Sequence, residues 1–319
     1  MNPFRPIYDL CNTGDPAEKL ATLAPFPRMI DVEPAGLCNQ KCRMCPTGLG
    51  SLGRAQGLMG EATFQRIVNE CAEHGTALRF IGFGEPLLNK KIVQFVRLAS
   101  DAGLLTHINS NSTKITSELA EALVDAGLSS FKASFQGTDS ETYVAMRRMD
   151  FFEGTVAAIK TMRDARGMKM LPFIAASTST THETPEQIAA FRARLEPLVD
   201  HLSVGATTFD YIVMADVPEK QRASLIEAAA LAQIEKRHPS PCPEVYDKLS
   251  IHWDGSVVSC CNDFSGINTL GNVNDTSISE LWRHPIMEKY RAKLAAHDYS
   301  LPLCDVCWDY ANLTEGIAA

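Results

Sequence analysis

The sequence predicts an α/β fold built on a parallel sheet, followed by a smaller α+β domain that carries cysteines. Three observations lead to this prediction. Between about residues 29 and 210, strand-like apolar runs alternate with helix-like stretches, which is typical of a parallel sheet covered by helices. The chain has 319 residues, enough for one large and one small domain. Most of its ten cysteines form two groups, one near each end of the chain.

The expected elements begin with a proline-containing lead-in over residues 1–28, with a helix at about 17–23. A first strand at 29–32 precedes a cysteine-bearing loop and an exposed loop that ends near residue 60. Further strands are expected at 78–83, 104–108, 131–135, 171–176 and 202–207. Helices are expected at about 61–73, 90–101, 116–126, 140–146, 153–165 and 185–196. Six strand units are two short of a closed eight-fold barrel, and side chains that carry chemistry should gather at the C-terminal strand ends.

The loop after the first strand carries Cys38, Cys42 and Cys45 at C-x3-C-x2-C spacing. Three thiolates on one loop can bind three irons of a [4Fe–4S] cluster and leave the fourth iron without a protein ligand. Zinc is the main alternative, but a closed zinc site needs four ligands and the nearby chain has no fourth Cys or His. Burial in the core is a third alternative, to which three cysteines beside Gly36 and Pro46 are a poor fit. The sequence favours the open cluster.

This loop resembles the signature of the radical SAM enzymes. The resemblance implies a partial (β/α)6 barrel over residues 29–210. It also implies that the open iron binds the amino and carboxylate groups of S-adenosylmethionine, which is then cleaved to a 5′-deoxyadenosyl radical. The position before the last cysteine is often aromatic in the family and is Met44 here, whose polarisable thioether can make a similar contact.

Two strand ends extend the resemblance to the binding of S-adenosylmethionine. The stretch Gly82-Phe83-Gly84-Glu85-Pro86 is similar to the GGEP motif of the family, so Gly84 and Glu85 are expected at the methionyl amine. Taken alone, these residues would also suit a glycine turn with a surface Glu. The next strand ends in a TNG-like stretch, which places Asn109 and Asn111 at the ribose hydroxyls. Taken alone, they would suit a turn equally well.

The fourth strand ends in Ser134-Phe135-Gln136-Gly137, which resembles the S-x-D-G stretch of the family. Ser134 is therefore expected at the ribose or the carboxylate, and the following Arg147 near the carboxylate. Gln136 replaces the usual Asp, so no role is carried over to it. Polar residues at the last two strand ends are either substrate contacts or ordinary loop residues: 177–182, Thr207, Thr208 and Asp210.

The second cysteine group lies beyond a charged, helical bridge expected at 211–241. Cys242, Cys260, Cys304 and Cys307 could form a four-ligand metal site next to a hairpin that turns at Asp254-Gly255. Ligand rules alone leave zinc and an iron–sulfur cluster nearly equal. The arrangement resembles the auxiliary-cluster domain of SPASM/twitch radical SAM enzymes, and it implies such a domain over residues 242–319. Five cysteines in place of seven favour the twitch form, with a single auxiliary [4Fe–4S] cluster.

Cys261 is left over in this scheme. It is either a packed cysteine, an alternative ligand to Cys260, or a thiol that donates a hydrogen atom to a substrate radical. Of the isolated cysteines, Cys71 falls on the apolar side of a helical pattern and is expected in the core. Cys11 lies in the polar lead-in and receives no role.

Composition restricts the function classes. A net charge of −8 argues against non-specific nucleic-acid binding and suits a neutral or cationic substrate. There is no secretory h-region and no apolar run of about 18 residues, so we expect a cytoplasmic protein that does not bind membranes. The expected partners are a small-molecule substrate and an electron donor such as flavodoxin or ferredoxin.

The expected activity is that of a radical SAM oxidoreductase. It would abstract hydrogen from a carbon of a small polyhydroxylated substrate, of sugar or aminocyclitol type, and pass an electron to the auxiliary cluster. The alternatives are an epimerase that uses Cys261 as hydrogen donor, or a maturase that modifies a peptide or protein. Residues 1–28 are too short for the precursor-binding domain of many maturases. A non-catalytic zinc or iron–sulfur protein is the alternative from another class.

Overall fold

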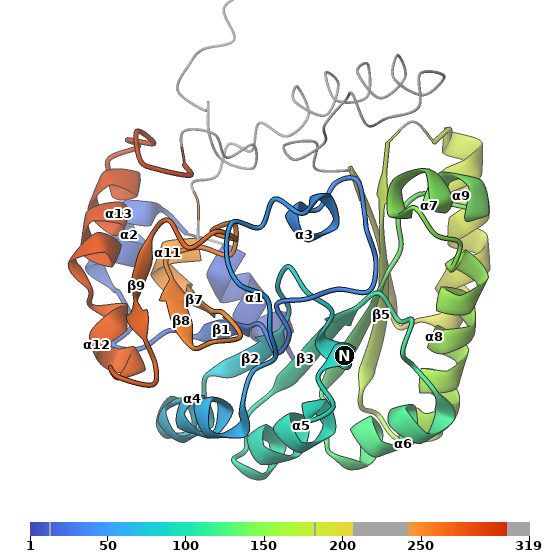
Figure 1. Cartoon of the computed structure of the whole chain (residues 1–319), viewed down its shortest axis with the longest axis horizontal. Coiled ribbons are helices and arrows are strands. Elements are labelled where there is room, and N and C mark those ends of the chain that lie inside the picture. Colours follow the sequence, from blue (N-terminus) through green and yellow to red (C-terminus); the bar gives the residue numbers. More distant parts are fainter. Residues whose placement is uncertain (13, 182, 207–241, 243, 305–319) are drawn as a thin grey trace, which may run out of the picture.

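The computed structural model describes residues 1–12, 14–181, 183–206, 242 and 244–304. Within this part, the strands form one nine-stranded sheet in the order β6-β5-β4-β3-β2-β1-β7-β8-β9. Figure 1 shows the sheet as an arc, with helices α4, α5, α6 and α8 along its outer side and the cysteine-bearing loop inside it. The arc therefore has an interior that the loop can reach.

The barrel part confirms the predicted α/β fold class, because its six strands are parallel neighbours. These strands are β1 (Met29–Val32), β2 (Ala77–Phe80), β3 (Thr106–Ser110), β4 (Ser130–Ser134), β5 (Phe173–Thr180) and β6 (His201–Ala206). The helices between them are α3 (Pro46–Leu49), α4 (Glu61–His74), α5 (Ile92–Asp101), α6 (Ser117–Asp125), α7 (Ser140–Arg147), α8 (Phe152–Arg166) and α9 (Pro185–Leu195). Two single-turn 3₁₀ helices complete this part, Pro86–Leu88 and Glu196–Leu198.

Helix α4 shows why the local sequence folds in this way. Its buried residues are Phe64, Ile67, Val68 and Cys71, a spacing that puts them on one face of a helix. The helix ends at Gly75, whose left-handed φ of 64° costs a glycine little. Helices with the same amphipathic pattern cover the outer face of the sheet. The burial of Cys71 on this face confirms it as a core residue.

The C-terminal part continues the barrel sheet. Its elements are α11 (Glu244–Asp247), β7 (Lys248–Ile251), β8 (Ser256–Val258), β9 (Thr269–Asn272), α12 (Ile278–Trp282) and α13 (Pro285–Ala295). The hairpin that turns at Asp254-Gly255 is confirmed. The sequence did not reveal that β7 pairs in parallel with β1, with Lys248 opposite Met29. The cysteine-bearing part is thus bonded directly to the first barrel strand.

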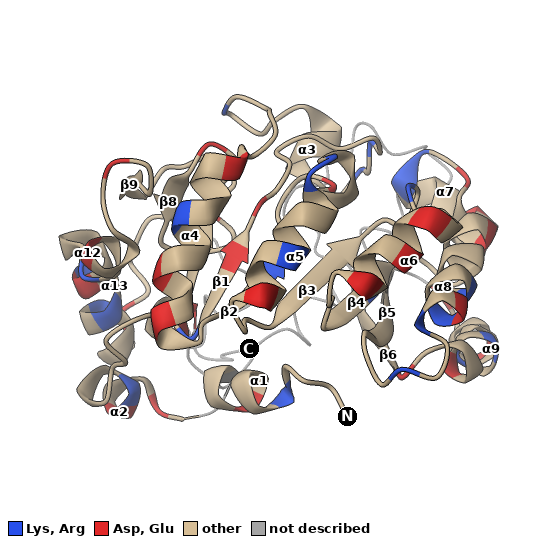
Figure 2. Ribbon diagram, turned by 90° about the horizontal axis from the view of Figure 1, so that it is seen from below, with Lys and Arg blue, Asp and Glu red and all other residues tan. Residues whose placement is uncertain are grey.

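The N-terminal segment forms α1 (Arg5–Asn12) and α2 (Pro16–Ala21), of which only α2 was expected. Phe4 and Cys11 pack with Met29 and Ala77, the first residues of β1 and β2. Figure 2 shows α1 on the side of the sheet opposite α3, and acidic and basic residues on the helices of the outer layer. Helix α1 therefore covers the N-terminal ends of the strands, and Cys11 is a core residue there.

The loop before α4 is mostly exposed, as expected, but two of its apolar side chains are buried. Leu52 and Met59 are buried, with 3% and 2% of their surface accessible. The indole of Trp253 lies against the loop, where a Cβ on Gly57 would come within 2.5 Å of the ring. The loop is therefore exposed along most of its length, as expected, and this tryptophan, about 200 residues further along the chain, packs against part of it.

Some predictions concern residues outside the described part. These are the bridge at 211–241, the last residues of the chain at 305–319, His182, Thr207, Thr208, Asp210 and Cys307. Among the described residues, none of the helices combines the length and the apolar character needed to cross a membrane.

Candidate active site

The loop that carries Cys38, Cys42 and Cys45 is fixed to two neighbouring elements. The hydroxyl of Thr47 donates a hydrogen bond to the carbonyl of Phe83, just after β2. The N–H of Glu85 donates to the Leu37 carbonyl (2.9 Å), and the N–H of Arg43 to the Met146 carbonyl in α7 (2.8 Å). The loop is therefore held over the C-terminal ends of the first strands, where a barrel active site is expected.

The three thiols of this loop share a partly buried environment. Burial raises the pKa of Cys38 to about 11, although the Gln40 N–H donates a hydrogen bond to its Sγ (3.4 Å). The negative charges of the other two thiolates raise this pKa as well, so the three sulfurs are electrostatic neighbours. Without a positive partner the thiolate forms of Cys38 and Cys42 are disfavoured, and bound iron would supply that partner.

The spacing of the sulfurs distinguishes between a zinc ion and a cluster. Among the described residues, one trio of metal-type ligand atoms lies within 4.8 Å of one another, namely Asp31, Glu244 and Cys261. No three described cysteines of either group lie that close together. A tetrahedral zinc ion with Zn–S bonds of about 2.3 Å would hold its sulfurs about 3.8 Å apart. The wider spacing of the thiols fits an iron–sulfur cluster better.

Arg147 connects the barrel wall to the cysteine loop. Its guanidinium donates to Gln40 Oε1 (2.7 Å) and to the carbonyls of Ser134 (3.0 Å) and Phe135 (3.1 Å). Burial raises the pKa of Cys42, and the positive charge of Arg147 counteracts this rise. Within the described part of the chain, the buried Nε of Arg147 has no hydrogen-bond partner. One N–H thus remains available for an anionic ligand at this position.

The residues of the GGEP-like stretch link two strand ends to the cysteine loop. The carboxylate of Glu85 accepts hydrogen bonds from the Leu87 N–H (3.0 Å), the Ser110 hydroxyl (2.7 Å) and the Asn111 N–H (2.7 Å). Burial raises the pKa of Glu85. A Cβ on Gly84 would lie 1.8 Å from the Ala35 carbonyl oxygen, so only glycine fits this position.

The two predicted ribose contacts have different surroundings. The amide of Asn111 donates to Asn39 Oδ1 (2.9 Å) and lies 3.7 Å from the sulfur of Cys38. Asn109 accepts a hydrogen bond from the Ser134 hydroxyl (2.9 Å). The structure therefore brings Glu85, Asn109, Asn111, Ser134 and Arg147 together around the cysteine loop. Their individual contacts with S-adenosylmethionine stay predictions.

The second cysteine group surrounds a cavity of about 80 Å³, called here the auxiliary cavity. Cys242, Cys260, Cys261 and Cys304 line it, together with apolar and tyrosine side chains. The Asn262 N–H donates to Cys260 Sγ (3.4 Å), a bond that would favour the thiolate of a metal ligand. Because Cys260 and Cys261 both line the cavity, the choice of ligand between them stays open.

Comparison with known proteins identifies the two parts. A family model of the radical SAM superfamily matches residues 32–191, half of the chain, and a SPASM model, an iron–sulfur cluster-binding domain, matches residues 242–308. The chain belongs to the radical SAM superfamily. A radical SAM protein with a SPASM domain uses [4Fe–4S] clusters and S-adenosylmethionine, so the predicted cofactors are confirmed. The finer assignment to the twitch form stays a prediction.

Individual relatives match parts of the chain. The AdoMet-dependent heme synthase of Methanosarcina barkeri is 31% identical over 140 residues, 44% of this chain and 40% of the relative. The PqqA peptide cyclase of Rhodopseudomonas palustris is 29% identical over 145 residues, 46% of this chain and 38% of the relative. The matched segments thus span about 40% of the length of these relatives.

Two solved structures show the same fold at low sequence identity. Streptococcus suis SuiB bound to the precursor peptide SuiA superposes with a TM-score of 0.66 at 17% identity, covering 86% of this chain and 69% of SuiB. BtrN in complex with AdoMet and 2-DOIA superposes with a TM-score of 0.52 at 18% identity, covering 84% of this chain and 87% of BtrN.

The interior of this radical SAM barrel contains two neighbouring cavities. The upper cavity, of about 220 Å³, lies at the C-terminal strand ends and is lined by Phe83, His252 and Cys261 among others. The lower cavity, of about 750 Å³, lies toward α1. Arg79 and Ile81 line both cavities. The interior therefore extends from the covered bottom of the barrel to the level of the cysteine loop.

The polar residues of this interior were not predicted from the sequence. On β4, Ser130 and Lys132 line the lower cavity, and Arg79 and His107 do so from β2 and β3. Each alternates along its strand with a buried apolar residue of the outer face. This alternation of polar and apolar residues was the signal in the sequence for a polar interior. A parallel strand packed against apolar layers on both faces would be apolar throughout.

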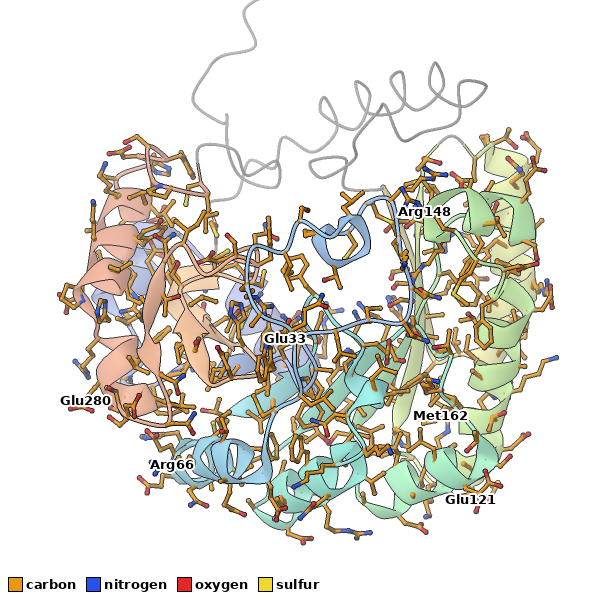
Figure 3. All side chains as sticks on the ribbon, in the orientation of Figure 1. Glu33, Arg66, Glu121, Arg148, Met162 and Glu280 are labelled. Carbon is orange, nitrogen blue, oxygen red and sulfur yellow. The ribbon has the colours of Figure 1, made fainter. Side chains whose placement is uncertain are left out.

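Glu33 was also missed, although it joins three segments of the site. Its carboxylate pairs with the Arg54 guanidinium (2.7 Å) of the loop before α4. It also accepts from the N–H groups of Phe83 (3.2 Å) and Trp253 (3.3 Å). Figure 3 shows Glu33 inside the arc of the sheet, whereas Arg66, Glu121 and Glu280 lie at the periphery. A glutamate directly after an expected strand was the available signal in the sequence.

Proposed function

We propose that this radical SAM enzyme oxidises a carbon centre of a small polyhydroxylated substrate, with the auxiliary cluster as electron acceptor. One observation carries the proposal. Cys261 and Asn262 line both the upper cavity and the auxiliary cavity. At another point of the upper cavity, Phe83 accepts a hydrogen bond from Thr47 of the cysteine loop. A substrate in the upper cavity would therefore lie between the two metal sites.

The predicted site residues would have three roles in this reaction. Cys38, Cys42 and Cys45 would hold the cluster that binds S-adenosylmethionine, and Cys242, Cys260, Cys304 and Cys307 the auxiliary cluster. Gly84, Glu85, Asn109, Asn111, Ser134 and Arg147 would position S-adenosylmethionine. When bound, these groups supply a hydrogen-abstracting carbon radical and a one-electron acceptor. Loss of one hydrogen atom, one electron and the hydroxyl proton converts an alcohol into a carbonyl.

His252 is suited to take the hydroxyl proton. Its imidazole belongs to the wall of the upper cavity, which Cys261 also lines. Burial lowers the pKa of His252 and the Arg54 guanidinium lowers it further, while Glu33, Asp254 and Asp263 act in the opposite direction. The imidazole is therefore neutral at pH 7 and can accept a proton.

The size of the interior supports a small substrate. Sites for small molecules occupy about 300–1,000 Å³, and the lower and upper cavities measure about 750 and 220 Å³. The polar side chains of Ser250 and His252 line the upper cavity and would bind hydroxyl groups there. The chain also covers 87% of BtrN, whose structure contains AdoMet and 2-DOIA.

Two other candidates have specific support. Peptide modification is supported by the similarity to PqqA peptide cyclases and to SuiB, which was solved with its precursor peptide. Epimerisation is supported by Cys261, whose position on the upper cavity would allow its thiol to return a hydrogen atom to the substrate.

Anaerobic reconstitution tests the proposal. We expect about eight irons and eight sulfides per chain, a brown protein, and formation of 5′-deoxyadenosine after reduction. Cys42→Ala should abolish that cleavage, whereas Cys304→Ala should lose about half of the iron and keep cleavage that is not coupled to product. About four irons with one zinc would remove the electron-accepting role of the second site. A protein without iron or cleavage would refute the proposal.

Cys261→Ala distinguishes the candidate reactions. If the enzyme oxidises its substrate, the Cys261→Ala variant should still form the carbonyl product. An epimerase should lose its product, and the wild-type enzyme in D₂O should place one deuterium in it. Stimulation of 5′-deoxyadenosine formation by a peptide, and not by polyols, would favour the maturase.

A further inference from the structure

The charged side chains inside the barrel are almost all paired. The Arg79 guanidinium forms two hydrogen bonds with the carboxylate of Asp31, at 2.6 Å each. The Lys248 ammonium pairs with Glu244. These pairs occupy β1, β2, β7 and the start of the C-terminal part, so this side of the lower cavity is electrically balanced.

The remaining charged side chains of the lower cavity lie toward α1 and β6, and two pairs account for most of them. Arg5 pairs with Asp9 (2.7 Å), and Asp200 pairs with Arg166. Lys132, in the middle of β4, is different. It lines the cavity, yet within the described part of the chain it has no ion pair or hydrogen bond. The wall thus presents one cationic side chain without a partner.

An unpartnered cation in this position is costly. Burial lowers the pKa of Lys132 to about 8, and the positive charge of Arg79 lowers it further, while Asp31 opposes this. The ammonium nevertheless stays mainly charged at pH 7. Burying a charge without a partner opposes folding, and such local conflicts are typical of functional sites. Lys132 is partly buried and its ammonium faces the cavity, so an anionic group that enters the cavity can pair with it.

We propose that the substrate carries a carboxylate or a phosphate group and that this group binds the ammonium of Lys132. The inference rests on the proposed function, because it places the substrate in the barrel interior. It changes the expectation drawn from the net charge of −8. Surface charges more than about 10 Å away are screened by salt, whereas a cation in a cavity acts at short range in a medium of low polarity.

The position of Lys132 orients the substrate. Lys132 lies opposite Asn109 and Ala175 in the sheet, two residues before Ser134. Two strand residues correspond to about 7 Å. The carbonyl of Ser134 accepts from Arg147, which bonds Gln40 of the cysteine loop. The anionic group would therefore bind deep in the barrel, with the reacting carbon at least about 7 Å nearer to the cysteine loop.

The test measures anion binding by the reconstituted protein. Sodium acetate and sodium phosphate are added at pH 7, with sodium chloride of equal ionic strength as reference, and the melting temperature is recorded. For the wild type we expect a saturable rise of about 2 °C at an anion concentration ten times the dissociation constant. Lys132→Met should lose the rise and Lys132→Arg should keep it. Lys90→Met, which removes an exposed lysine, should behave as the wild type does.

The outcomes separate this inference from the proposed function. A rise with acetate alone or with phosphate alone identifies the group that the site prefers. An equal rise in Lys132→Met, or no rise in the wild type, would overturn the inference. Formation of 5′-deoxyadenosine by the same wild-type preparation tests the proposed function independently: if cleavage occurs without an anion effect, only the inference fails. If an anion effect occurs without cleavage, the anion site stands and the proposed function fails.

Discussion

Replacing Lys132 by methionine is expected to stabilise the protein at pH 7. Methionine keeps most of the length of the side chain and removes the unpartnered charge. Burial lowers the pKa of Lys132 from 10.5 to about 8. A shift of that size corresponds to at most roughly 3 kcal/mol of lost stability at pH 7. For a chain of 319 residues, 1 kcal/mol changes the melting temperature by about 1.5 °C, so the variant should melt roughly 4 °C higher.

The effect must also depend on pH in a defined direction. Below pH 8 the lysine is protonated in both states, and the folded state carries the whole penalty. Between pH 8 and 10.5 the unfolded chain binds more protons than the folded one, so the stability of the wild type rises with pH. The difference between the variant and the wild type should therefore shrink from roughly 3 kcal/mol at pH 7 to about 1 kcal/mol at pH 9.5.

The assay is thermal unfolding of the anaerobic holoenzyme at pH 7 and pH 9.5. Lys90→Met serves as matched control, because Lys90 is exposed. It should change the melting temperature by less than 1 °C at either pH, as surface substitutions usually do. The reasoning is refuted if Lys132→Met melts below the wild type at pH 7, or if the gain is the same at both pH values. Either result would mean that the ammonium has a partner in the folded protein.

Three further substitutions test the site. Gly84→Ala should lose about half of the iron. The new Cβ would lie 1.8 Å from the Ala35 carbonyl oxygen and would displace the segment before the cysteine loop. An unchanged iron content would contradict this. Arg147→Lys should lower the rate of S-adenosylmethionine cleavage about tenfold or more, since an ammonium cannot replace the directed contacts of the guanidinium. Equal rates in the variant and the wild type would show that these contacts are dispensable. Product formation should decline on acidification, as protonation removes the acceptor lone pair of His252, and the midpoint should lie below pH 6.5 because burial lowers the pKa of this histidine. His252→Gln should lose most activity and this acidic limb, and a variant that keeps the limb would exclude the histidine.

The features predicted correctly from the sequence are those that short stretches encode. The six strands and their helices follow from patterns of four to fifteen residues, as in the apolar face of α4. Cap residues such as Thr116, whose hydroxyl accepts the Leu119 N–H (3.2 Å), mark helix starts in the same local way. The two cysteine groups were found because spacing alone restricts the metal that can bind.

The features that were missed depend on contacts between distant segments. Thr269–Asn272 contains Gly271 and Asn272, residues typical of turns, but pairing with β8 makes it strand β9. Whether a charged residue is paired also depends on the folded structure. Asp31 and Arg79 are 48 residues apart and form an ion pair, while Lys132 has no such partner among the described residues. No local pattern distinguishes these cases.

The same long-range contacts determine how the two metal sites are related. The sequence suggests a barrel and a separate domain, whose relative position a linker would leave free. In the structure, β7 is hydrogen-bonded to β1. Glu33 follows β1 and binds Arg54, the Phe83 N–H and the Trp253 N–H. One carboxylate thereby ties together the segment after the cysteine loop, the GGEP-like stretch and the hairpin of the C-terminal part. Because electron transfer from a substrate depends on distance, a spacing set by a continuous sheet and a buried ion pair suits the proposed transfer of an electron to the second cluster.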